Sequence, residues 1–337
     1  MPLKLGVVDQ SPVRTGGTAA DAVRETLELA RITERLGYHR YWLAEHHSTN
    51  SFAGSSPAVL IPAVAAATQR MRVGSGGVML SHYSPLQVAE NFRMLETLFP
   101  GRIDLGVGRA PGGDPRTALA LQYGRGDIGI DNFPRQVEDL VGWVTDGFGD
   151  QHPWRRVRAM PRAATAPEVW LLGSGGSSAL YAAELGCGYS FAQFISGEDG
   201  AGLVQAYRER FRPSARLAAP AASAALGVIC AETAEEAQRL AASLELWRRR
   251  IMRGMDRGIP SPDEALAELG DGWAPPPVGQ DGARMIAGDA SRVRAELLRV
   301  ADRYGVDELM IVTVTHDFAS RVRSYELIAE AMGMPHA

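Results

Sequence analysis

The stretch RIDLGVGRAPGGD, residues 102–114, has the pattern of a strand that ends in a glycine-rich loop. Ile103, Leu105 and Val107 alternate with less apolar residues, which predicts a short buried strand. The strand runs into Gly108-Arg109-Ala110-Pro111-Gly112-Gly113, where glycines let the backbone come close to a ligand. Arg109 brings a fixed charge and a planar fork of donors that suits a phosphate. These residues alone leave two interpretations open, an anion site or an ordinary surface turn.

The same sequence of an apolar run, a polar or glycine-rich turn and a helical segment recurs along the chain. The predicted strands are residues 5–8, 41–44, 71–80, 103–107, 169–172, 189–194, 225–231 and 309–314. Eight strands that alternate with helices predict an α/β fold, a closed (β/α)8 TIM barrel, with residues 1–337 as one domain.

A long insertion separates the seventh and eighth predicted strands, at about residues 232–290. Its first part, residues 234–255, has a helical pattern, whereas residues 258–290 look irregular and contain three consecutive prolines at 275–277. The insertion leaves the barrel at the end where active sites of this fold lie, so it is a candidate lid. A spacer without a function is the alternative.

The composition excludes several classes of function. The chain has 337 residues, is 45% hydrophobic and carries a net charge of −4, so nothing indicates a nucleic acid or an anionic membrane as partner. Only two cysteines occur, Cys187 and Cys230, which is typical of a reduced, cytoplasmic protein. We see no leader segment and no apolar run of membrane-spanning length.

In a barrel, the polar residues that follow the strands share one mouth. They are Asp9-Gln10, Glu45-His46-His47, Gly76-Gly77, Gly108-Arg109, Ser174 to Ser178, Gln193 and His316. The turn from Gly173 to Ser178 opens a helix, and a helix N-terminus favours an anion, so this turn and Arg109 together predict a phosphate site. An ordinary capped turn is the alternative. A Rossmann fingerprint, Gly173-x-Gly175-x-x-Ser178, fits less well because four βα units precede it and its third glycine is absent.

Two further features of the predicted mouth are candidates for a catalytic or binding role. His46 and His47 point to opposite faces if they extend a strand, so at most one faces the site, as a base, a hydrogen-bond donor or a packed structural residue. A metal site would need more ligands than these. Gly76-Gly77 interrupts a strand, which indicates a bulge, a distorted peptide or a close approach of a ligand.

Several motifs in one order resemble the bacterial luciferase-like monooxygenase superfamily, in its single-chain FMN-dependent branch. They lie at residues 42–47, 74–80, 85–90, 100–112, 169–174, 306–310 and 321–325. The resemblance runs almost end to end and is weakest at about residues 250–286. It implies a TIM barrel that uses reduced FMN and O2, through a C4a-flavin peroxide, to oxidise an organic substrate. A separate flavin reductase would supply the reduced FMN.

The resemblance also assigns roles to single residues. The residues that it implies for FMN binding are Gly76, Gly77, Gly108, Arg109, Ser174, Gly175, Gly176, Ser177 and Ser178. Arg109 and the turn at 175–178 would hold the phosphate, and Gly76-Gly77 falls where the family often has a cis peptide against the flavin ring. His46 falls at a proposed catalytic base. Gly108 stands where some luciferase chains have a reactive cysteine, and Ser174 where they have a glutamate.

The family commonly forms homodimers through the helices after the second and third strands. Apolar residues that could supply this surface are Leu60, Ile61, Val64, Ala65, Phe92 and Leu95. Two other functions stay open: an F420-dependent oxidoreductase, which the superfamily also contains, and a flavin-binding protein without catalysis. The substrate is not identified by the sequence.

Overall fold

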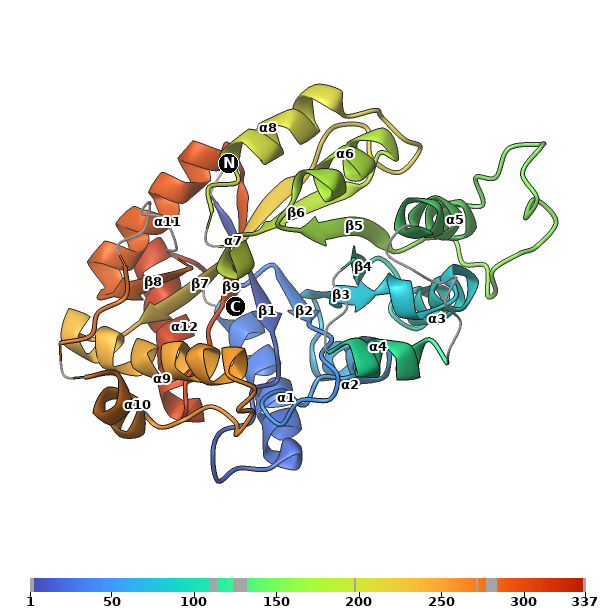
Figure 1. The fold of residues 1–337 in the computed structure, drawn as a ribbon. Coiled ribbons are helices and arrows are strands. Elements are labelled where there is room, and N and C mark those ends of the chain that lie inside the picture. Colours follow the sequence, from blue (N-terminus) through green and yellow to red (C-terminus); the bar gives the residue numbers. More distant parts are fainter. Residues whose placement is uncertain are drawn as a thin grey trace.

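Parallel strands form a closed barrel, and helices surround it (Figure 1). The computed structural model describes residues 3–109, 114–123, 132–196, 198–270, 272–276 and 284–335. The barrel strands are β1 (Lys4–Asp9), β2 (Arg40–Leu43), β3 (Arg72–Met79), β4 (Ile103–Gly108), β5 (Glu168–Gly173), β6 (Gly188–Ala192), β7 (Ala222–Cys230) and β9 (Glu308–Val312). Their order is β6-β5-β4-β3-β2-β1-β9-β7, and pairing of β6 with β7 closes the barrel. The predicted eight-stranded TIM barrel is therefore confirmed.

The predicted helices are also present. The helices between and after the barrel strands include α1 (Ala19–Arg35), α2 (Pro57–Ala67), α3 (Pro85–Leu98), α5 (Phe133–Thr145), α6 (Gly176–Glu184), α8 (Ala201–Arg210), α11 (Ala290–Tyr304) and α12 (Phe318–Met332). Shorter helices that the sequence did not indicate are η1 (Leu80–His82), α4 (Pro115–Leu121) and α7 (Gln193–Ser196). Among the described residues, no helix combines the length and the apolar character needed to cross a membrane.

The insertion between β7 and β9 is more regular than the sequence indicated. It contains α9 (Ala234–Met252), as predicted, but also α10 (Pro262–Leu269) and a ninth strand, β8 (Met285–Gly288). Residues 258–290 are therefore not irregular throughout. The start of β7 pairs with β6, whereas Gly227 to Cys230 pair with β8. The length of β7 thus lets β8 continue the sheet beyond the end of β6.

Side chains alternate between the two faces of the barrel wall. Val8, Trp42, Trp170, Met310 and Val312 belong to one cluster of buried residues in the barrel interior. The rings of Trp42 on β2 and Trp170 on β5 meet edge to face at 5.5 Å, although these strands are not neighbours. The neighbouring residues on the same strands, such as Val7, Leu171 and Ile311, face outward and belong to the larger cluster that also contains helix residues. The interior is therefore filled by side chains, as expected of a barrel core.

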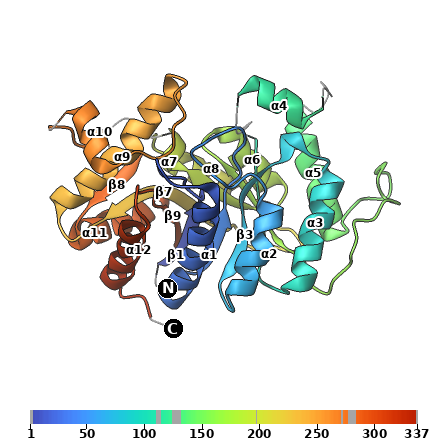
Figure 2. The ribbon, with the colours of Figure 1, turned by 90° about the horizontal axis from the view of Figure 1, so that it is seen from below.

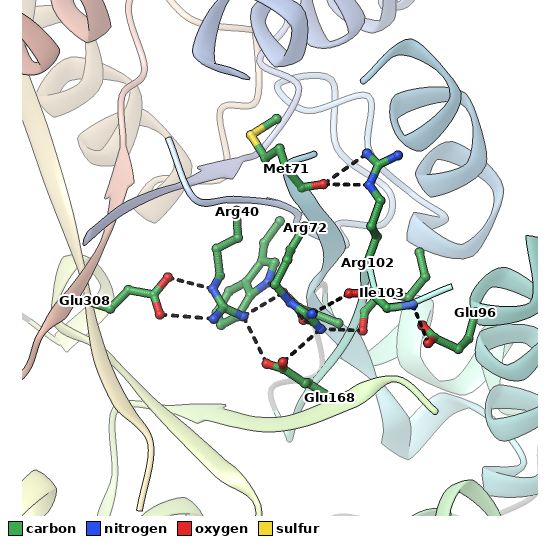
Figure 3. A network of polar contacts seen from close by, with 11 residues as sticks. Arg40, Met71, Arg72, Glu96, Arg102, Ile103, Glu168 and Glu308 are labelled. Carbon is green, nitrogen blue, oxygen red and sulfur yellow. Dashed lines mark hydrogen bonds and ion pairs between the residues drawn. The ribbon is translucent and has the colours of Figure 1, made fainter. Parts of the chain in front are cut away.

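Charged residues close the end of the barrel where the strands begin (Figure 3). The Arg40 guanidinium donates to both carboxylate oxygens of Glu308, at 2.6 and 3.1 Å, and to Asp104 at 2.7 Å. Arg72 donates to the other oxygen of Asp104, at 2.8 and 2.6 Å, and Glu168 lies 3.5 Å from Arg40 and 3.2 Å from Arg72. Figure 2 shows both termini at this end, and α4, α9 and α10 toward the opposite end.

Candidate active site

The parallel strands all end at the opposite side of the barrel, which we call the mouth. Arg109 directly follows β4, the turn at residues 174–175 joins β5 to α6, and His46 lies three residues after β2. Gly76 and Gly77 lie within β3, next to β4 in the sheet. The topology therefore brings the predicted site residues to one end of the barrel.

Within the described part of the chain, the predicted phosphate site has open space and hydrogen-bond donors without partners. Gly108 on β4 pairs with Leu172 on β5, so Arg109 and the turn after β5 leave from neighbouring strand ends. Arg109 is exposed, and Gly175 caps α6 without a side-chain hydrogen bond, which leaves the first N–H groups of the helix available. A Cβ added at Gly175 would meet nothing within 4 Å. Residues 110–113 of the predicted loop lie outside the described residues.

The Gly76-Gly77 pair forms a compact part of the wall near the mouth. Their peptide bond is cis, as the resemblance implied, and the register with β4 shifts between Gly76 and Val78. A Cβ added at Gly76 would lie 2.8 Å from Cβ of Trp42, and one at Gly77 would lie 2.8 Å from the carbonyl oxygen of Gly106. Only glycine fits both positions, because the neighbouring backbone and ring leave no room.

His46 lies in a largely apolar environment beside the mouth. Its ring is 4.6 Å from the ring of Phe52, and its backbone N–H donates to the carbonyl of Gly54 at 2.8 Å. Burial, with a smaller effect of the neighbouring His47, lowers the pKa of His46 to about 4. The imidazole is therefore neutral at pH 7. Its Nδ1 atom is buried and has no hydrogen-bond partner within the described part of the chain, so a ligand could supply one.

The neighbouring Glu45 and His47 take a structural part in the same corner. The buried Glu45 carboxylate accepts hydrogen bonds from the backbone N–H of Met79 at 2.9 Å and the hydroxyl of Tyr83 at 2.6 Å. It also hydrogen-bonds with Nε2 of His47 at 2.7 Å. Glu45 thus ties the end of β2 to the residues that follow Gly76-Gly77. His46 and His47 have different surroundings, but they follow the end of β2 and do not extend the strand, so the strand alternation used in the prediction does not apply to them. The partner Tyr83 gave no signal in the sequence.

Residues of the insertion and of the loop after β2 cover the mouth. The Trp247 ring of α9 meets the Phe52 ring at 5.1 Å, and its Nε1–H donates to the hydroxyl of Ser51 at 2.8 Å. Ile259 is buried in the same cluster, and its carbonyl oxygen lies 3.0 Å from Nδ1 of His316. Sequence reasoning missed Phe52, Trp247 and Ile259, because their contacts join segments about 200 residues apart.

Two polar residues predicted at the mouth have structural contacts instead. Asp9 is fully buried and accepts a hydrogen bond from the Arg321 guanidinium of α12 at 2.7 Å. Burial alone would raise its pKa, but Arg321 and Tyr41 outweigh that effect and hold the pKa low. Gln193 opens α7, and its side-chain oxygen accepts from the Tyr304 hydroxyl at 3.3 Å. Asp9 therefore links the barrel to its helical layer.

Comparison with known proteins matches this geometry to one family. The family model described as "Luciferase-like monooxygenase" matches residues 3–308. The uncharacterized protein YwcH of Bacillus subtilis (strain 168) is 46% identical, over 98% of this chain and 99% of its own length. The N-acetyl-S-alkylcysteine monooxygenase of the same bacterium is 37% identical, over 98% of both chains.

Solved structures agree with this relationship. The structure of apo-MsnO8 has a TM-score of 0.91 and 40% identity, and the match covers 99% of this chain and 100% of that one. Two more distant structures share the fold. The oxygenating constituent of 3,6-diketocamphane monooxygenase from Pseudomonas putida, in complex with FMN, has a TM-score of 0.69 at 18% identity and covers 98% of both chains. An F420-dependent secondary alcohol dehydrogenase has a TM-score of 0.69 at 14% identity and covers 98% of this chain and 99% of its own. From its barrel, its mouth and these matches, the chain belongs to the luciferase-like monooxygenase family.

Proposed function

We propose that this protein is a monooxygenase that binds reduced FMN at the mouth and uses O2 to oxidise an organic substrate. The observation that carries the proposal is the open space at Gly175, before α6, beside the strand end that carries Arg109 and the compact Gly76-Gly77 wall. We place the anionic group of the cofactor at the first part and its flat ring against the second. The FMN complex of the diketocamphane enzyme supports FMN as the cofactor.

In this proposal, different residues of the mouth bind the phosphate and the flavin ring of FMN. Arg109 would hold the phosphate by charge-assisted hydrogen bonds, together with the N–H groups and hydroxyls of Ser177 and Ser178. The Gly76-Gly77 backbone would lie against the flavin ring. When bound, reduced FMN supplies the two electrons that O2 chemistry requires.

His46 is the side chain that we place nearest to the chemistry. Because burial keeps it neutral at pH 7, its ring offers one N–H donor and one acceptor nitrogen. The unpartnered Nδ1 can therefore hold a hydrogen bond to the flavin or the substrate, or accept a proton from it. Phe52 packs on the ring and fixes its plane.

The cover of the mouth would keep water away from the reaction. Phe52, Trp247 and Ile259 present apolar surface there, and the Trp247–Ser51 hydrogen bond holds α9 in place. In this proposal residues 232–290 act as the lid, and exclusion of water protects reactive flavin species from side reactions.

We propose that a separate reductase delivers the reduced FMN, since the diketocamphane relative is described as an oxygenating constituent of its enzyme. Titration with reduced FMN under nitrogen tests cofactor binding. Admission of isotopically labelled O2 with a panel of thioethers, aldehydes and polycyclic aromatics then tests catalysis. Labelled oxygen in a product supports the proposal. Hydride exchange with F420 and no oxygen incorporation would instead favour the F420-dependent alternative.

We also propose a homodimer, formed by α2 and α3, but through different residues from those that the sequence indicated. Ile61, Val64, Ala65, Phe92 and Leu95 are buried against the barrel, and Leu60 is partly buried. The exposed apolar side chains of these helices are Val59, Met94 and Leu98, at 74%, 50% and 58% exposure. Sedimentation of the Met94→Lys variant tests this surface: a monomer is expected, and an unchanged dimer rejects the assignment.

A further inference from the structure

A cavity of about 350 Å3 opens beside the mouth, between the loops after β1 and β2 and the segment after α9. We call it the rim cavity. The residues that matter for its chemistry are Arg14, Thr49, Asn50, Phe52 and Arg257, and small residues such as Gly16 complete its lining. Its volume is in the range of small-molecule sites.

The charge of the rim cavity is one-sided. Two guanidiniums line it, those of Arg14 and Arg257, and none of its lining residues is acidic. Arg14 is paired with Glu25. Arg257 is exposed and interacts electrostatically with Glu268, whose pKa it helps to lower, but among the described residues its side chain makes no hydrogen bond. The next acidic side chain, that of Asp256, is turned toward the backbone N–H of Asn50 and the Ser51 hydroxyl instead.

The backbone that carries the two arginines is held in place. Ile259 N–H donates to the carbonyl of Val13 at 2.9 Å, and Thr15 N–H donates to the carbonyl of Ile259 at 2.9 Å. The Thr15 hydroxyl donates to the carbonyl of Arg257 at 3.3 Å. These bonds attach the segment after α9 to the loop after β1. The backbone is therefore already ordered, and ligand binding costs less conformational entropy.

Phe52 connects the rim cavity to the proposed reaction site. It lines the cavity, and its ring contacts His46 at 4.6 Å and Trp247 at 5.1 Å. The apolar part of a molecule held by its polar end in the cavity would lie against Phe52, whose ring also contacts His46. The two sites are separated by one aromatic side chain.

We propose that the rim cavity binds the carboxylate of the substrate, and that the substrates are small organic acids with an apolar, oxidisable part. The inference rests on the proposed function and specifies its substrate class. A guanidinium pairs with a carboxylate in a planar, two-bond geometry. Asn50 and Thr49 add neutral hydrogen-bonding groups at the same wall. The FMN phosphate has its own site across the mouth, at Arg109 and α6.

Binding of two probes of the same shape tests this inference. (Phenylthio)acetate and (phenylthio)acetamide have nearly the same shape but differ in charge, because an NH2 group replaces one carboxylate oxygen. Calorimetry measures the affinity of each for the FMN-loaded protein. We expect the acid to bind at least about tenfold more tightly than the amide, since one hydrogen bond to a charged group is worth that much. The Arg257→Gln variant should lose this preference. Equal binding of acid and amide to the unchanged protein would overturn the inference.

The matched control is Arg253→Gln, which removes the same charge from an exposed arginine outside the cavity lining. It should keep the preference for the acid, and an equal loss in both variants would reject the assignment to Arg257. FMN fluorescence titrations separate the two proposals. Weaker FMN binding in Arg257→Gln would show that the cavity serves the cofactor, and would overturn the inference. If the unchanged protein does not bind FMN, the proposed function fails, and the acid–amide comparison on the free chain still decides the role of the cavity.

Discussion

Replacement of Asp104 by asparagine removes the carboxylate that joins Arg40 and Arg72 in the charged network at the end of the barrel where the strands begin. The Asp104 side chain is fully buried. One oxygen accepts from Arg72, and the other accepts from Arg40 at 2.7 Å and from the indole N–H of Trp42 at 2.8 Å. Burial alone would raise the pKa of Asp104, but Arg40 and Arg72 outweigh it and hold the pKa below its usual range.

The expected cost follows from what the substitution leaves behind. Arg40 keeps its two bonds to Glu308, but its side chain is only 6% exposed, so water cannot replace the lost carboxylate. The asparagine amide also turns an N–H group toward one of the two arginines. Loss of one partner from a buried ion pair costs about 3–5 kcal/mol. We expect a decrease of that size in the free energy of unfolding.

Urea unfolding, followed by circular dichroism, measures this change. The control is Glu168→Gln at the edge of the same network, where the carboxylate is 49% exposed and lies 3.5 Å from Arg40. An exposed pair contributes about 0–1 kcal/mol, so this variant should remain close to the unchanged protein. FMN affinity should not change in either variant, because the network lies at the other end of the barrel. Equal stabilities of the two variants would refute the argument that burial sets the cost.

Three further predictions concern the mouth. Arg109→Ala should weaken FMN binding at least about tenfold in a fluorescence titration, whereas Arg116→Ala, on α4, should not. The pKa of His46 is about 4 in the folded protein and 6.5 in the unfolded chain, so its stabilisation is complete above pH 6.5 and is lost as the pH falls toward 4. A decrease in pH from 7 to 4 should therefore lower the free energy of unfolding of the unchanged protein by on the order of 3 kcal/mol more than that of His46→Gln. Parallel pH profiles of the two proteins would contradict the lowered pKa of His46. Trp247→Ala should speed amide hydrogen exchange at residues 48–53, since it removes the Phe52 contact and the Ser51 hydrogen bond; unchanged exchange would show that α9 does not hold this loop.

The barrel was predictable because its information is local. A strand buried on both faces needs a continuous apolar run, and a turn to a helix needs glycine or a capping residue, so each βα unit is visible by itself. β8 escaped the prediction because Met285–Gly288 is only four residues long. Its strand conformation depends on pairing with Gly227 to Cys230, about 60 residues away in the chain. No pattern within so short a segment could indicate that partner.

The candidate site was predictable in part, for the same reason. Arg109 and His46 follow strand ends, and the topology alone brings such residues to one mouth. The cover was not predictable, because Trp247 meets Phe52 only after α9 has packed across the barrel. The dimer surface shows a further limit. The apolar pattern of α3 did not reveal that Phe92 faces the barrel while Met94 faces outward.

The two ends of the barrel use charge in opposite ways. At the closed end, Arg40 and Asp104 are buried, and each is saturated by partners on neighbouring elements, since an unpaired buried charge would cost more than folding can offset. At the mouth and the rim cavity beside it, Arg109 and Arg257 are exposed, so water solvates them and they need no buried ion pair. Nδ1 of His46 is buried and has no hydrogen-bond partner within the described chain, and there the cost falls on a neutral ring. Under the proposed function, the groups that would bind a ligand can therefore lack protein partners at little cost, whereas the buried charges at the closed end cannot.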